Sequence, residues 1–160
     1  MSCCGQPEGA GGAGGADGAS GVMISMEFPI VQYDFAAAGE AAARIKQILR
    51  QLGISSDLVR RAAVAAYEAE MNLVIHAIGG SLSLVVDSGR ITLTSRDEGP
   101  GIPDISLAMR EGFSTASDEV REMGFGAGMG LPNMKRCSDL FNIESNMGAG
   151  TVVTIVIGVN

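Results

Sequence analysis

Two glycine-rich stretches constrain this chain more than any other feature of its sequence. The first covers residues 97–102 and reads Asp-Glu-Gly-Pro-Gly-Ile, and the second covers residues 124–131 and reads Gly-Phe-Gly-Ala-Gly-Met-Gly-Leu. Glycine at alternate positions lets the backbone turn sharply and come very close to another group. Either stretch alone is most often a plain turn or linker. As a pair they predict the border of a ligand site.

The residues around these glycines indicate which ligand the site binds. Asp97 follows a predicted strand, and its carboxylate can accept a hydrogen bond from the exocyclic amine of a flat ring. The second stretch has unpaired N–H groups and leads into a helix with Pro132 in its first turn, so it can face an anion. A purine on the first stretch and phosphates on the second form a nucleotide site. Neither stretch has the GxGxxG spacing or a Gly-Lys-Ser/Thr motif, which argues against a Rossmann or P-loop site.

A long helix predicted over residues 55–78, with an N-cap signal at Ser55, supplies a third element. Glu68, Asn72 and His76 are spaced four residues apart and share one side of it. The amide oxygen of Asn72 can coordinate Mg²⁺, and a carboxylate one turn earlier can orient or deprotonate a nucleophile. The alternative is a solvated stripe of an amphipathic helix, which the glycine stretches make the weaker interpretation. For His76 we expect an imidazole bonded to nearby backbone.

The remaining pattern predicts an α+β domain. Alternating apolar residues indicate strands at 27–33, 82–86, 91–95, 141–146 and 151–157. Pro29 indicates that the first strand lies at a sheet edge, because proline cannot donate to the ladder. Apolar residues at three- and four-residue steps indicate a helix over 41–52, and Asp104 is a cap for a short helix ending at Met109.

Two further expectations concern the second half of the chain. The helix that contains Pro132 is expected to bury Leu131, Met134, Cys137 and Leu140. Residues 113–123 show no apolar period, so we expect a mobile lid beside the site. Glu98, which follows Asp97, is expected to point into solvent.

Composition narrows the class of protein. A length of 160 residues suits one domain, which we place at residues 23–160 behind a disordered Gly/Ala-rich tail at residues 1–22. The net charge of −7 argues against nucleic acid or an anionic membrane as a partner and favours a protein. The chain has no CxxC pair, no signal-peptide pattern and no apolar run of membrane-spanning length, so we expect a cytoplasmic protein with free thiols.

Four motifs taken together resemble the N, G1, G2 and G3 boxes of the Bergerat-fold ATPases, the GHKL superfamily. They are Glu68-x-x-x-Asn72, Asp97-x-Gly99-x-Gly101, Gly126-x-Gly128-x-Gly130-Leu131 and Gly148-x-Gly150-Thr151. The strings at residues 112–115 and 130–136 look like the anti-sigma-factor serine/threonine kinase branch, especially its switch-protein kinases. The resemblance implies a two-layer α/β sandwich, in which helices cover one face of a mixed, mainly antiparallel sheet.

The same resemblance implies roles for individual residues. Glu68 would be the catalytic acid/base, Asn72 would hold the Mg²⁺ that bridges the phosphates, Asp97 would accept from the adenine amino group, and the Thr151 hydroxyl would lie near the adenine, often by way of water. The other positions implied to contact ATP are Gly99, Gly101, Ile102, Gly124, Gly126, Gly128, Met129, Gly130 and Leu131.

The implied function is transfer of the γ-phosphoryl of MgATP to a serine or threonine of a small STAS-like regulatory protein, in a partner switch that can include a sigma factor. A homodimer is left open. The chain lacks the arginine that related kinases have just before the G2 glycines, and Arg121, folding in with the lid, is our candidate to replace it. The alternative is an ATP-gated binding module that docks a partner without phosphoryl transfer. Glu68 favours the enzyme, and the missing arginine favours the module.

Overall fold

A computed structural model describes residues 21–124, 126 and 128–160 of the chain. The tail predicted over residues 1–22 lies outside the described residues except for its last two, and the first strand already begins at Val22. The elements, in chain order, are β1 (Val22–Ile30), α1 (Glu40–Gln51), α2 (Ser56–His76), β2 (Gly80–Asp87), β3 (Arg90–Asp97), α3 (Ile105–Ala108), α4 (Asp118–Glu122), α5 (Gly130–Cys137), β4 (Leu140–Asn146) and β5 (Gly150–Gly158).

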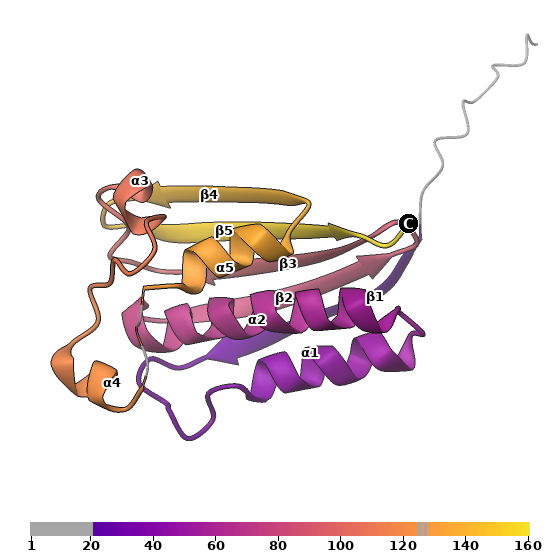
Figure 1. Cartoon of the computed structure of the whole chain (residues 1–160), viewed down its shortest axis with the longest axis horizontal. Helices are drawn as coiled ribbons and strands as arrows, with labels where there is room; N and C mark the ends of the chain where they lie inside the picture. Colours follow the sequence, from indigo (N-terminus) through magenta and orange to yellow (C-terminus); the bar gives the residue numbers. More distant parts are fainter. Residues whose placement is uncertain (1–20, 125, 127) are drawn as a thin grey trace, which may run out of the picture.

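The strands form one five-stranded sheet in the order β1-β2-β3-β5-β4. Helices α1, α2 and α5 lie side by side over one face of it, so the domain has two layers (Figure 1). The predicted α+β sandwich is therefore confirmed, with β1 at an edge as Pro29 indicates. Every pairing between the described strands is antiparallel, so the sheet is antiparallel throughout rather than mixed.

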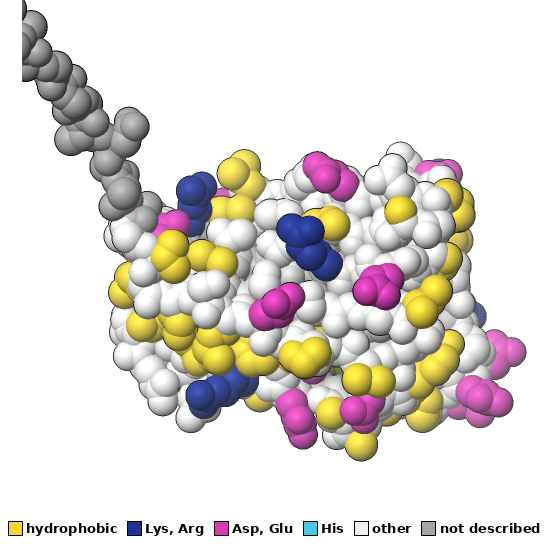
Figure 2. Space-filling model, turned by 180° about the vertical axis from the view of Figure 1, so that it is seen from behind, with side chains coloured by type: hydrophobic (Ala, Val, Ile, Leu, Met, Phe, Trp, Pro, Cys, Tyr) yellow, Lys and Arg dark blue, Asp and Glu magenta, His cyan; other side chains and the backbone are white. Residues whose placement is uncertain are grey.

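The core lies between the sheet and the helices. Alternate side chains of the central strands point into it and are fully or almost fully buried: Leu82, Leu84, Val86, Ile91, Leu93, Val153, Ile155 and Ile157. Each buried aliphatic side chain of this kind contributes roughly 1.5–3 kcal/mol. Among the described residues no helix covers the opposite face of the sheet, and charged side chains are interspersed there with hydrophobic ones (Figure 2).

Helix α2 is the centre of the helical layer and ends two residues earlier than predicted. His76 is its last residue, and Ala77 is already extended. The N–H of Ile78 donates to the carbonyl of Gly99 at 3.4 Å, so the chain leaves the helix to pair with the first glycine loop. Strand β1 also ends early, at Ile30, and Tyr33 adopts a positive φ of 62° while its N–H donates to Val74.

The N-terminus of α1 is capped by a side chain from α2. The carboxylate of Glu70, only 2 % exposed, accepts hydrogen bonds from the backbone N–H groups of Gly39, Ala41 and Ala42 at 2.9, 3.2 and 2.9 Å. These are among the N–H groups that a helix start leaves without partners, and Gly39, at the N-cap, has no side chain to serve them. Glu70 therefore ties α1 to α2.

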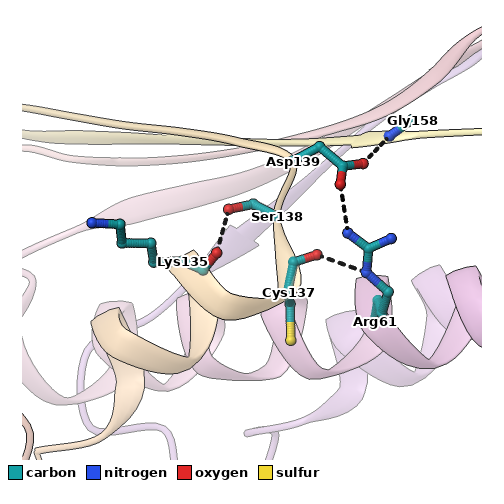
Figure 3. Close-up of polar contacts among 6 residues, drawn as sticks. All are labelled: Arg61, Lys135, Cys137, Ser138, Asp139 and Gly158. Carbon is teal, nitrogen blue, oxygen red and sulfur yellow. Dashed lines mark hydrogen bonds and ion pairs between the residues drawn. The ribbon is translucent and has the colours of Figure 1, made fainter.

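A polar cluster joins α2 to the ends of α5 and β5 (Figure 3). Arg61 donates from Nε to the carbonyl of Cys137 at 3.1 Å and from Nη2 to Asp139 Oδ1 at 3.0 Å. Asp139 Oδ2 accepts from the N–H of Gly158 at 2.7 Å, and this bond is the main cause that lowers the pKa of Asp139. The cluster fixes where α5 ends and β4 begins.

The predicted core face of α5 is correct only in its first half. Leu131 and Met134 are buried, but Cys137 is half-buried and Leu140 is 65 % exposed. Leu140 lies in β4 rather than on the helix, because α5 stops at Cys137. Burial raises the pKa of the Cys137 thiol, so it stays protonated at neutral pH.

Candidate functional site

A cavity of about 650 Å³ lies between α2, the loop after β3 and the described residues of the stretch 113–131. Its volume falls in the range of small-molecule sites. Every residue that the sequence predicts to contact a nucleotide lines it: Glu68, Asn72, Asp97, Gly99, Gly101, Ile102, Gly124, Gly126, Gly128, Met129, Gly130, Leu131 and Thr151. Glu98 is exposed, as expected. The functional roles of the lining residues stay predictions.

One region of the cavity is built around Asp97. Its Oδ1 accepts from the N–H groups of Gly99 and Thr151, both at 3.0 Å. Within the described part of the chain Oδ2 has no hydrogen bond, so it is available to a donor in the cavity. Gly150 makes this packing possible, because a Cβ there would lie 2.1 Å from the Asp97 carbonyl oxygen.

Another region is built from α2 and the start of α5. Glu68 Oε1 accepts from Asn133 Nδ2 at 3.1 Å. A Cβ on Gly130 would lie 3.1 Å from Asn72 Oδ1 and 3.4 Å from Glu68 Oε2, so the first residue of α5 lies against both side chains. Asn133 was not predicted as a site residue. Its signal was its place one turn after the glycines, on the helix that faces Glu68.

These two side chains suit Mg²⁺ only with help from the ligand. Asn72 and Glu68 offer oxygen donors, and Mg²⁺ sites usually combine one or two such donors with phosphate oxygens and water. Among the described residues, no group of three His, Cys, Asp or Glu side chains could hold a metal ion without a ligand. The donor set therefore fits a metal that arrives with phosphates.

His76 has a different partner from the one expected. Its Nδ1 lies 3.3 Å from Thr115 Oγ1, so the imidazole meets a side chain of residues 113–123 rather than backbone. Both residues line the cavity. Burial lowers the pKa of His76, because the charged imidazolium is poorly solvated there.

Residues 113–123, predicted to be a mobile lid, contain a short helix and make apolar contacts with α2. They contain α4, whose N-cap Ser117 accepts from the N–H of Val120 at 3.4 Å. Ala116 and Val120 are buried against Met71 and Ile75 of α2. The prediction missed this anchor because two apolar residues are too few to show a period.

The same segment is also fixed by backbone contacts. The N–H of Gly112 donates to Gly128 at 3.0 Å, and a Cβ on Gly128 would lie 2.5 Å from Phe113 O. Arg121 donates from Nη2 to the carbonyl of Ser114 at 2.9 Å and does not line the cavity. In this structure it therefore stabilises the segment, and the predicted role in neutralising phosphate has no support from its position.

The sequence of this chain matches a known protein family. A sequence model of the family described as histidine kinase-, DNA gyrase B-, and HSP90-like ATPase matches residues 54–160, which contain all four motifs. The chain belongs to this ATPase family. ATP is therefore the ligand that the cavity is expected to bind, with Asp97 and the glycine stretches along its wall.

Within the ATPase family, the chain is similar to bacterial regulators. It is 30 % identical over 131 residues to the serine/threonine-protein kinase RsbT of Bacillus subtilis, covering 79 % of this chain and 90 % of that protein. It is also 30 % identical over 131 residues to the anti-sigma F factor of Geobacillus stearothermophilus, covering 77 % and 86 %. The chain is thus a relative of RsbT-type serine/threonine kinases and anti-sigma factors over most of its length.

Solved structures share the fold. The SiaB-SiaC complex of Pseudomonas aeruginosa contains a chain that matches with a TM-score of 0.58 and 12 % identity, over 85 % of this chain and 89 % of that one. The RsbU and RsbW domains of a Mycobacterium tuberculosis protein match with a TM-score of 0.55 and 14 % identity, over 83 % of this chain and 31 % of that one.

A search of the described residues for membrane-spanning helices finds none of sufficient length and hydrophobicity.

Proposed function

We propose that this ATPase-family chain is a serine/threonine protein kinase of the anti-sigma regulatory type. It transfers the γ-phosphoryl group of MgATP to a hydroxyl of a small STAS-like regulatory protein. The observation that carries this proposal is the placement of Glu68, whose carboxylate lies in the cavity against Gly130 at the start of α5 and is oriented by Asn133. A carboxylate in that place is suited to take a proton from an attacking hydroxyl.

The arrangement along α2 supports one direction for the bound nucleotide. Glu68 and His76 are separated by eight residues, which is roughly 12 Å of helix. After α2 the chain enters β2, where Gly80 pairs with Asp97. The purine therefore lies toward the C-terminal end of α2, with its amino group facing Asp97, and the phosphates lie toward Glu68 and Asn72.

The transfer step follows from this direction. The substrate oxygen forms a bond to the γ-phosphorus while the bond between that phosphorus and the β–γ bridging oxygen breaks, and ADP leaves. The hydroxyl proton goes to Glu68 Oε2, which has no hydrogen bond within the described residues. Mg²⁺ held through Asn72 and the phosphates would neutralise charge in the transition state. Backbone N–H groups at the glycines beside α5 would bind the phosphate oxygens.

The second candidate is an ATP-gated binding module without transfer. It is favoured by the cavity wall, on which no Lys or Arg of the described residues lies. Phosphoryl transfer usually relies on such a cation besides the metal. In either case the partner is a protein, which suits the net charge of −7. The names of the relatives support a regulatory protein as this partner, with a sigma factor as a further one. A homodimer is compatible with both.

The test is phosphate incorporation, measured by intact mass, into STAS-domain proteins of the same organism incubated with MgATP and this chain. A single added phosphate that disappears with Asp97→Asn supports the kinase. The Asp97→Asn protein should retain its unfolding midpoint and lose ATP binding by calorimetry, because the amide would present a donor to the adenine amine. Complex formation that depends on ATP but yields no phosphorylated product would favour the binding module.

A further inference from the structure

We propose that Ser145, a β4 residue outside the four motifs, is a positioning residue that makes the site selective for adenine. It orients the Thr151 hydroxyl so that its hydrogen points at the purine N1. The inference rests on the proposed ATP site at Asp97. Thr151 lines the cavity and Ser145 does not, so Ser145 affects the ligand only through Thr151.

Three polar atoms compete for the Ser145 hydroxyl. The N–H of Ile102 donates to Ser145 Oγ at 2.7 Å, which occupies one lone pair of that oxygen. Thr151 Oγ1 lies 2.8 Å from Ser145 Oγ, and the carbonyl of Gly150 lies 3.5 Å away. A hydroxyl–oxygen bond is best near 2.7–2.8 Å and is weak at the longer distance. The Ser145 hydrogen therefore goes to Thr151 Oγ1.

This direction leaves the hydrogen of Thr151 without a partner in the described residues. Thr151 is only 6 % exposed, and a buried hydroxyl hydrogen needs an acceptor. Its side chain lines the cavity beside Asp97, because its own N–H donates to Asp97 Oδ1. The acceptor is therefore expected on the bound base, reached directly or through one water.

The two neighbouring groups together match adenine. Adenine presents a 6-amino donor next to the N1 acceptor, and guanine presents a carbonyl next to an N1–H donor. Asp97 offers an acceptor and Thr151, oriented by Ser145, offers a donor. Guanine would place its carbonyl oxygen against the carboxylate and its N1–H against a hydroxyl hydrogen. Without Ser145 the Thr151 hydroxyl can turn and accept instead, so the discrimination at N1 is lost.

The experiment compares ATP with ITP, whose base presents a 6-carbonyl next to an N1–H, as guanine does. Wild-type protein is expected to bind ITP about a hundredfold more weakly, because both the Asp97 and the Thr151 contacts are mismatched. Ser145→Ala should reduce this ratio about tenfold, because the Thr151 hydroxyl can then accept from the N1–H, and Ser145→Thr should restore the wild-type ratio. Loosening of the Ile102 loop would weaken the binding of both nucleotides alike. The ratio of the two affinities therefore reports only the direction of the Thr151 hydroxyl.

Controls keep the outcome decisive. Ser83→Ala is the matched exchange, because Ser83 also lies in the sheet, donates to a strand carbonyl at 3.4 Å and is not on the cavity wall; its ratio should equal the wild-type ratio. Should Ser145→Ala fail to fold, Thr151→Val must reduce the ratio of ATP to ITP affinity by a similar factor. ATP binding with an unchanged ratio in these variants would overturn this inference alone. Absence of ATP binding by wild-type protein would overturn the proposed function with it.

Discussion

Glu68 and Glu70 stand two residues apart on α2, and the structure uses their carboxylates in opposite ways. Glu70 is buried and accepts three backbone hydrogen bonds from the start of α1. Glu68 faces the cavity and, within the described residues, accepts one side-chain hydrogen bond, from Asn133. A carboxylate whose acceptor positions are filled by backbone stabilises the fold, whereas one with a free oxygen in a cavity can exchange a proton. The same residue type thus stabilises the fold on one side of the helix and is the proposed base on the other.

The largest effect is expected from Glu68→Ala. Removal of the proposed base should slow phosphoryl transfer by about 10³-fold, because positioned acid/base groups contribute on that scale. ATP affinity and the urea midpoint should stay near wild-type values. Single-turnover phosphoryl transfer to the partner protein measures the rate, and urea unfolding of the same variant checks that its stability is unchanged. A fully active variant would remove Glu68 from the mechanism and end the contrast with Glu70.

Glu70→Ala should give the converse result. Loss of the buried cap leaves three helix-start N–H groups unsatisfied and should cost about 3 kcal/mol of unfolding free energy. Such a loss would lower Tm by roughly 10 °C for a domain of this size. Urea denaturation measures the change, and Glu40→Ala, an exposed acid at the first residue of α1, is the control. Equal stability of the two variants would contradict the structural role of Glu70.

Asn133→Ala tests how the proposed base Glu68 is oriented. Without the Nδ2 donor, Glu68 keeps its charge but loses its fixed orientation, so transfer should slow about tenfold with little change in ATP affinity. Lys135→Ala is a suitable control, because Lys135 is an exposed residue of the same helix. A rate equal to wild type would mean that the 3.1 Å contact does not position Glu68.

The smallest effect concerns pH and His76, on the same helix. Burial lowers the pKa of His76 in the folded chain below its unfolded value of 6.5. As the pH falls through 6.5, the unfolded state binds more protons at this histidine than the folded state does. The free energy of unfolding is therefore highest above pH 6.5 and decreases as the pH falls toward the lower pKa of the folded chain. The drop in urea midpoint between pH 7.5 and pH 5.5 should be smaller for His76→Gln than for wild type. An identical drop in both proteins would assign the pH dependence to other groups.

Much of the site could be predicted because its signals are local in the sequence. The four-residue spacing of Glu68 and Asn72 fixes a shared helix side, and glycines at alternate positions are needed wherever backbone must approach another group. Helix and strand periods were also sufficient to predict the α+β class. The predicted ends were less accurate. Helix α2 stops at His76, and the N–H of Ile78 then donates to Gly99, which is a contact between residues distant in the sequence.

From the sequence alone we could predict the order of the elements, the four motifs and therefore the family, since each depends on neighbours within one turn or one loop. The folded structure was needed to show that Glu70 caps α1, that Ser145 lies behind Thr151, and that Ala116 and Val120 hold residues 113–123 against α2. In each case the partners come from different elements. A hydrogen bond or an apolar contact between them exists only after the sheet and helices have packed.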